Sequence, residues 1–233
     1  MVNSILDSIQ NFRYERKFHV TELTDQEMDV LIRHHPSLFN EIYQERNVNN
    51  IYFDTLDKQS YMDNKDGLTR RLKVRIRWYG ELFGKVEQPV LEFKVKHNLH
   101  IGKLSYPLKS FVFNEDIALS SLRRIMEESD LPAVICMHLK QLDFSLVNRY
   151  RRKYFLSADR RFRLTKDLDL EVLRIAPFGN IFIEKIKDDR SIILELKYTH
   201  AQEEEAEAVT RHFPFRATRS SKYVNGIERL EVW

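Results

Sequence analysis

The sequence contains little of what divides a chain or cross-links it. Its 233 residues include one cysteine, six glycines and six prolines, so an intramolecular disulfide is excluded and no flexible linker stands out. No apolar run approaches the roughly 18 residues that a membrane-spanning helix needs, and the N-terminal segment lacks the pattern of a signal peptide. We therefore expect one domain over residues 1–233, in a soluble and cytoplasmic protein.

A large excess of charge of either sign is also missing. Lys and Arg total 38 against 35 Asp and Glu, which gives a net charge of +3. A strongly basic site must then arise from segregation of charge within the fold. The near balance also argues against a nucleic-acid partner. The hydrophobic content of 42% is enough for a full core.

The most informative pattern that is present lies in residues 71–78, RLKVRIRW, where cationic and apolar residues strictly alternate. On a β-strand this period of two places Arg71, Lys73, Arg75 and Arg77 on one face. Like charges about 7 Å apart repel by about 2 kcal/mol at an effective dielectric constant near 20. The row therefore predicts an anionic ligand that resembles polyphosphate.

Other predicted strands repeat this alternation of charged and apolar residues. They are residues 13–21, 90–96, 161–167 and 192–199. In residues 147–157 both faces carry basic residues, so the inward face there is ambiguous. Burying an unpaired charge costs several kcal/mol, so these strands need a wet interior or a bound counter-ion. We expect an α+β fold in which a closed antiparallel barrel encloses the charged faces and helices pack outside.

Carboxylates lie among these cations. Glu15, Glu92 and Glu195 would repel a polyphosphate unless a divalent cation, Mg or Mn, bridged carboxylate and phosphate oxygens. The competing interpretations stay open at this point. The charged faces could be solvated faces of ordinary strands, and Glu92 and Glu195 could be ion-pair partners of neighbouring cations.

Helical periodicity and capping residues predict four helical regions. They are residues 25–34 with Thr24 as N-cap, 115–143, 201–212, and a short helix that carries Lys222 after a cap at Ser220 or Ser221. A strand is expected at 48–54 and a turn at 64–67. Lys166 is expected to face solvent, and Cys136 is expected to be a core thiol.

Taken in order, several segments resemble the polyphosphate polymerase domain of the vacuolar transporter chaperone (VTC) family, a branch of the triphosphate tunnel metalloenzymes. The matching segments are RYERKF (13–18), IYFDT (51–55), RIRWYG (75–80), LEFKVK (91–96), YRRKYFLSADRRFRLTKD (150–167), LELKY (194–198) and SSKYVNGI (220–227). The resemblance implies an antiparallel barrel of about eight strands around a tunnel. It also implies transfer of the terminal phosphoryl group of ATP onto a growing polyphosphate chain.

The resemblance implies roles for individual residues. The phosphate-binding set would be Lys17, Arg75, Arg77, Lys94, Lys103, Tyr150, Arg152, Arg163 and Lys222. Glu195 would bind the metal, Mn or Mg. The residues directly involved in catalysis would be Lys17, Arg75, Arg77, Lys94, Arg152 and Glu195. Phosphoryl transfer suits this set because it depends mainly on positioning and charge neutralisation.

Departures from the wider superfamily favour transfer over hydrolysis. Tunnel triphosphatases generally carry Glu-x-Glu-x-Lys on the first strand, whereas this chain has Arg13, Glu15 and Lys17. The late strand has Glu195 followed by Lys197, so the chain lacks carboxylates for a two-metal site that activates water. A triphosphatase acting on tripolyphosphate or nucleoside triphosphates and a non-catalytic polyphosphate-binding module remain alternatives. A membrane partner is compatible with the resemblance, and no adenine pocket is identified.

Overall fold

The computed structural model describes Ile9 and residues 12–230. Most of the N-terminal segment that we expect to lack a signal peptide lies outside the described residues. None of the helices in the described part of the chain combines the length and the apolar character that crossing a bilayer requires.

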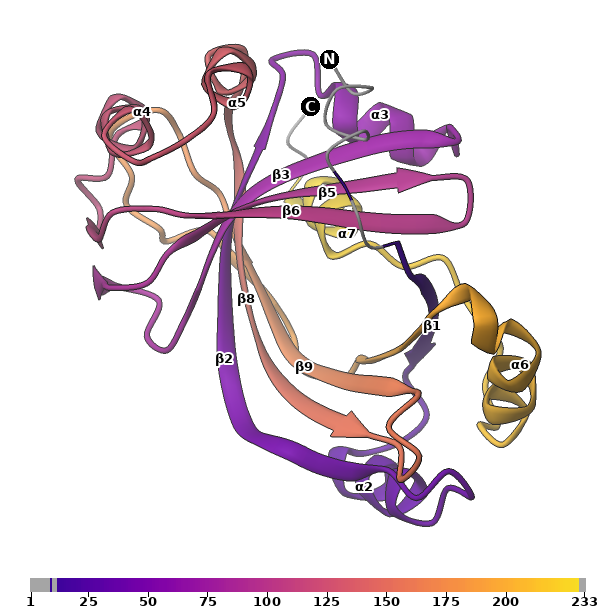
Figure 1. Cartoon of the computed structure of the whole chain (residues 1–233). Coiled ribbons are helices and arrows are strands. Elements are labelled where there is room, and N and C mark those ends of the chain that lie inside the picture. The colour runs from indigo at the N-terminus through magenta and orange to yellow at the C-terminus, as the bar shows by residue number, and fades with distance from the viewer. Residues whose placement is uncertain (1–8, 10–11, 231–233) are drawn as a thin grey trace.

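A large antiparallel sheet dominates the structure (Figure 1). Its strands are β1 (Tyr14–Val20), β2 (Asn40–Asp54), β3 (Arg70–Tyr79), β5 (Val90–His97), β6 (His100–Pro107), β8 (Asp143–Leu156), β9 (Arg163–Leu173), β10 (Lys185–Asp188) and β11 (Ile192–Tyr198). They are ordered β1-β11-β9-β8-β2-β3-β5-β6, and β10 pairs with β9. A separate small sheet pairs β4 (Gly84–Val86) with β7 (Phe111–Phe113).

The sheet is curled but is not a closed barrel, which corrects the sequence-based prediction. Its edge strands β1 and β6 do not pair along their length. One bridge links them at Arg13 and Ile101, with N···O distances of 3.0 and 2.9 Å. Closure requires tilt and stagger to bring both edges into register, whereas one backbone bridge joins these edges in the described part of the chain. Periodicity within each strand carries no information on this register.

The apolar face of each strand packs outward, as the alternation predicts. Val74, Ile76 and Trp78 of β3 are almost fully buried in a cluster that includes Leu122 and Ile135 of two outer helices. Burying each such side chain stabilises the fold by about 1.5–3 kcal/mol. A second cluster joins β1, β9 and β11 to helices on another part of the outer surface.

The helices lie mostly outside the sheet (Figure 1), but the last one packs on the face that carries the charged residues. They are α2 (Asp25–Arg33), α3 (Gln59–Lys65), α4 (Leu119–Glu127), α5 (Ala133–Leu139), α6 (Glu203–Arg211) and α7 (Lys222–Leu230), with a 3₁₀ turn η1 (His200–Gln202). The single helical region expected at 115–143 is two helices, because Pro132 is the N-cap of α5 and proline cannot continue a preceding helix. Helix α3 was not predicted, and it includes the first two residues of the turn predicted at 64–67.

The cap of α2 is confirmed, and the expectation for Lys166 is wrong. Thr24 and Glu27 form a capping box, in which each side chain accepts a hydrogen bond from the other's backbone N–H. Lys166 of β9 is fully buried and forms ion pairs with Asp25 and Asp29 of α2. Lys166 does not face solvent because α2 covers this outer face of the sheet.

Helix α7 packs tightly on the sheet. Ser221 caps it, since its Oγ accepts a hydrogen bond from Val224 N at 3.3 Å. Gly226 permits the approach, because a Cβ there would lie 2.8 Å from Leu146 Cδ2. The Tyr223 hydroxyl donates to Asp54, a buried residue of β2. This packing fixes the position of Lys222, the first residue of the helix.

Candidate functional site

Charged side chains from strands that are not neighbours meet inside the curled sheet. Lys94 Nζ of β5 lies 2.8 Å from Glu15 Oε2 of β1 and 3.8 Å from Glu195 Oε1 of β11. Arg77 Nη2 of β3 donates to the Tyr150 hydroxyl of β8 at 2.9 Å. None of these strand pairs shares backbone hydrogen bonds. The charged faces therefore point into one shared interior, which we call the tunnel.

One side of the tunnel is organised around Glu92 of β5. Arg75 donates to Glu92 Oε2 from both Nε at 2.8 Å and Nη2 at 2.6 Å, and Lys103 Nζ lies 2.6 Å from Oε1. Burial raises the pKa of Glu92, but Arg75 and Arg77 outweigh it and hold the pKa well below its ordinary value. Glu92 is therefore a charged partner that positions Arg75 and Lys103.

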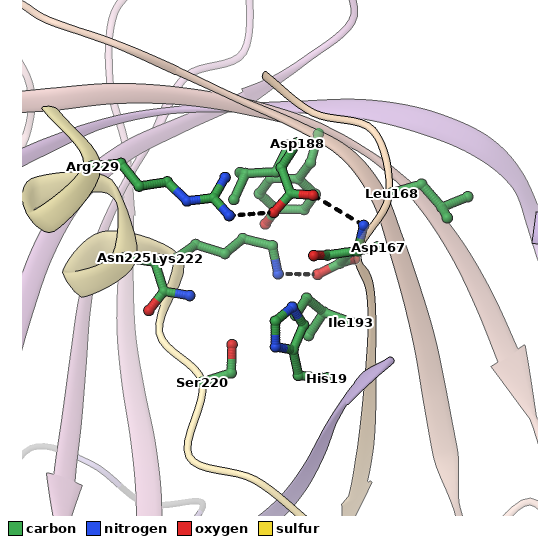
Figure 2. Close-up of a pocket in the computed structure, with 12 residues that line it drawn as sticks. His19, Asp167, Leu168, Asp188, Ile193, Ser220, Lys222, Asn225 and Arg229 are labelled. Atoms are coloured by element: carbon green, nitrogen blue, oxygen red, sulfur yellow. Dashed lines mark hydrogen bonds and ion pairs between the residues drawn. The ribbon is translucent and has the colours of Figure 1, made fainter. Parts of the chain in front are cut away.

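A second group joins strands β8 and β9 to helix α7. Arg152 donates to both carboxylate oxygens of Asp167, at 2.5 and 2.7 Å. Lys222 Nζ reaches the same carboxylate at 2.5 Å, as Figure 2 shows beside the Arg229–Asp188 pair. Burial opposes ionisation of Asp167, but Arg152 and Lys222 prevail and lower its pKa to about 2. The sequence placed Asp167 on this face without giving it a role.

Glu195 lies where the remaining cations meet. Its Oε1 is 3.3 Å from Lys17 Nζ, and its Oε2 is 3.1 Å from Lys197 Nζ and 3.8 Å from Arg152 Nη2. Although burial disfavours the charge, Lys197, Lys17 and Lys94 keep the pKa of Glu195 well below its ordinary value. Glu195 is therefore an ionised carboxylate in the tunnel.

Tyr150 lies between guanidinium groups. It accepts from Arg77, and the Cζ of Arg152 lies 5.2 Å from its ring centroid. Burial opposes ionisation of the phenol, but Arg152 and Arg77 together lower its pKa to about 8. The Tyr150 hydroxyl is therefore a strong hydrogen-bond donor that faces the tunnel.

Lys73 of β3 was part of the predicted cationic row but was not assigned to the site. Its Nζ donates to Ser221 Oγ at 2.7 Å, and no carboxylate of the described residues pairs with it. Burial, followed by the ammonium groups of Lys17 and Lys94, holds the pKa of Lys73 well below its ordinary value. The cations around Lys73 therefore oppose its protonation, and an anionic ligand beside it would favour the ammonium form.

The structure brings together nine of the ten predicted residues: Lys17, Arg75, Arg77, Lys94, Lys103, Tyr150, Arg152, Glu195 and Lys222. Arg163 differs, because it is exposed at the first position of β9 and forms no ion pair within the described part of the chain.

Glu15 and Glu195 are tunnel carboxylates that lie close enough together to share a divalent cation. Glu195 Oε1 is buried and receives no hydrogen bond from the described residues. Glu15 and Glu195 share the ammonium groups of Lys17 and Lys94. No group of three His, Cys, Asp or Glu among the described residues could hold a metal ion. A divalent cation that uses one or two carboxylates and completes its coordination with phosphate oxygens would find its protein ligands in Glu195 and the neighbouring Glu15.

A family model described as the VTC domain matches residues 12–231, nearly the whole chain. The chain belongs to the VTC domain family. The resemblance seen in the sequence motifs is thereby confirmed. No curated protein matches the sequence significantly.

Solved structures show the fold of this VTC domain in other proteins. A putative adenylyl cyclase from Hippeastrum, described as having a dominant triphosphatase activity, is 14% identical with a TM-score of 0.55, covering 93% of this chain and 96% of that one. A putative adenylate cyclase from Vibrio parahaemolyticus is 10% identical with a TM-score of 0.50, covering 91% and 98%. At these identities the likeness concerns the fold alone.

Proposed function

We propose that this VTC domain is a metal-dependent polyphosphate polymerase that transfers the terminal phosphoryl group of ATP to a polyphosphate chain inside the tunnel. The observation that carries the proposal is the environment of Lys73, which pairs in register with Lys94 of β5 and lies between Arg71 and Arg75 on the same face of β3. Such a cluster is costly when empty and favourable around linked phosphates.

The reaction needs little covalent chemistry from the protein. A terminal phosphate oxygen of the acceptor attacks the γ-phosphorus of ATP, the bond to the β-phosphate oxygen breaks, and ADP leaves. In the proposal Arg75, Arg77 and Arg152 neutralise the phosphate oxygens, and Lys17, Lys94 and Lys222 align the chain. Lys103 and Tyr150 contribute further contacts, and Arg163 would join them only at the periphery.

Glu195, with Glu15 beside it, would hold the divalent cation, Mn or Mg. When bound, this cation would neutralise charge on the transferring phosphoryl group. The Glu195 carboxylate is suited to the role because it is buried and already ionised.

The residue two positions after Glu195 on β11 favours transfer over hydrolysis. There Lys197 places its Nζ 3.1 Å from Glu195 Oε2, where a triphosphatase of the pattern described above would have a second carboxylate. A one-metal site lacks the arrangement that activates water between two cations. Triphosphatase activity is the second candidate, and the description of the Hippeastrum protein is what favours it.

The test is incubation of the purified protein with ATP and MnCl₂, with ADP, orthophosphate and polymer measured separately. The proposal expects ADP together with a long anionic polymer, and Glu195→Gln should abolish both. Glu207→Gln, an exposed carboxylate of α6, is the matched control and should behave as wild type. Rapid release of orthophosphate without polymer would establish the triphosphatase instead. Binding of tripolyphosphate without turnover would indicate a non-catalytic module.

The proposed ligands are ATP, tripolyphosphate and polyphosphate. The cytoplasmic location expected from the cysteine content belongs to the same proposal, because ATP is abundant there. A membrane partner that receives the polymer would be a separate protein.

A further inference from the structure

One mouth of the tunnel carries a cluster of tyrosines around an arginine. The guanidinium carbon of Arg46 lies 4.9 Å from the ring centroid of Tyr43, 5.4 Å from that of Tyr79 and 6.0 Å from that of Tyr154. Tyr43 is 53% exposed and Tyr79 is 49% exposed. About half of each of these two tyrosines is therefore open to solvent, with Arg46 over one face of each ring.

The early half of β2 places this cluster. This strand begins at Asn40, near α2, instead of at the predicted residue 48 (Figure 1). Two register irregularities interrupt its pairing with β8, on either side of Tyr43. Such bulges change the direction in which side chains point. Arg46 then pairs in register with Arg152, and Tyr43 pairs with Tyr154.

The cluster is continuous with the phosphate-binding residues. The guanidinium carbons of Arg46 and Arg152 lie 6.0 and 5.9 Å from the ring centroid of Tyr154. Arg152 also lies over the ring of Tyr150. A single tyrosine ring therefore separates the exposed mouth from a guanidinium inside the tunnel. This spacing suits a ligand that has a flat π-system outside and phosphates inside.

We propose that the Tyr43, Arg46 and Tyr79 mouth stacks the base of a nucleoside triphosphate whose phosphates occupy the tunnel. The inference rests on the proposed function and deepens it by assigning the nucleotide end of the substrate. Aromatic rings and guanidinium planes both stack on bases, and they do so with little preference because every base has a π-face. The site therefore takes ATP and GTP alike, while inorganic tripolyphosphate makes no use of it.

The experiment compares a non-hydrolysable ATP analogue, adenylyl imidodiphosphate, with inorganic tripolyphosphate in binding calorimetry. Tyr43→Ala and Tyr79→Ala should each raise the Kd of the nucleotide by about tenfold, or about 1.4 kcal/mol, because each removes a ring that stacks on the base. The Kd of tripolyphosphate should stay within about twofold. Tyr43→Phe should keep wild-type nucleotide affinity, because the ring alone does the stacking.

Phe178→Ala is the control, because Phe178 is a 78% exposed aromatic residue outside the mouth cluster. It should change neither Kd. Equal losses for nucleotide and tripolyphosphate in Tyr43→Ala would overturn the stacking site and show a general effect on the tunnel. Salt-sensitive binding of single-stranded RNA that exceeds nucleotide binding and is lost in the same variants would also overturn it. If wild-type protein binds neither probe, the proposed function itself fails, which is a distinct result.

Discussion

Lys94 and Glu15 form an ion pair across the open seam of the sheet. The Nζ atom lies 3.0 and 2.8 Å from the two carboxylate oxygens, although β5 and β1 share no backbone hydrogen bonds. The pair shows that side chains complete the enclosure that the backbone leaves open. It also places an ammonium group where linked phosphates would bind.

The first prediction concerns pH. Burial lowers the pKa of Lys94 to about 8 in the empty protein, and bound phosphate oxygens would stabilise its ammonium form and raise that pKa. The complex would then hold a proton that the free protein loses above pH 8, so tripolyphosphate affinity should fall as pH rises, by up to about tenfold per pH unit.

Titration calorimetry at pH 7, 8 and 9 measures this slope. Lys94→Met should bind more weakly and lose its part of the slope. Tyr150 also has a pKa of about 8 and could contribute to the same slope. Tyr150→Phe removes that contribution and should keep the part of the slope that comes from Lys94. Affinity that rises between pH 8 and 9 would contradict the assignment.

The second prediction is that replacing Lys73 raises the stability of the protein and weakens its binding of tripolyphosphate. Lys73→Met removes a buried amine whose protonation is opposed by neighbouring cations, so the ligand-free protein should gain about 1–2 kcal/mol of unfolding free energy, judged from like charges at strand spacing. Tripolyphosphate affinity should fall by about tenfold. Urea denaturation and calorimetry report the two effects. Lys109→Met, at an exposed lysine, is the control, and a variant that is less stable yet binds normally would refute the argument.

Lys166 gives a third prediction, on the outer face of the sheet. Because Lys166 is fully buried against Asp25 and Asp29, Lys166→Met should lower the unfolding free energy by about 1–3 kcal/mol, since each carboxylate loses one of its charged partners. Tripolyphosphate affinity should not change, since the side chain points away from the tunnel. A parallel loss of affinity would show that α2 is coupled to the site.

The fourth prediction concerns Gly226 of α7. A Cβ at this position would lie 2.8 Å from Leu146 Cδ2 and 3.1 Å from Val172 Cγ1, so Gly226→Ala should push α7 away from the sheet. The gain in helix propensity, about 1 kcal/mol, is smaller than the overpacking cost of about 1–3 kcal/mol. We expect a lower Tm together with weaker tripolyphosphate binding, because Lys222 moves with the helix. An unchanged Kd for tripolyphosphate would show that the position of α7 does not affect binding.

Much of the tunnel could be predicted because its residues follow strand periodicity. Arg75, Arg77 and Lys94 lie on uninterrupted strands, where alternation alone assigns the face. Tyr43 and Arg46 could not be placed in this way, since the irregular pairing around Tyr43 breaks the period.

Long-range pairing sets the other limit of sequence reasoning. Lys166 belongs to the outer face by parity, but its partners lie more than 130 residues away in the chain, and nothing near it in sequence announces a buried lysine. The open seam between β1 and β6 has the same origin. Strand stagger is a property of the whole sheet, so no single strand encodes it.

The most direct test of the tunnel is a crystal structure of the protein soaked with tripolyphosphate and MnCl₂. We expect three linked phosphates inside the curled sheet, with oxygens within hydrogen-bond distance of Lys73, Arg75 and Arg152 and a metal on Glu195. Tripolyphosphate bound only on the outer surface, with the interior ion pairs unchanged, would contradict it.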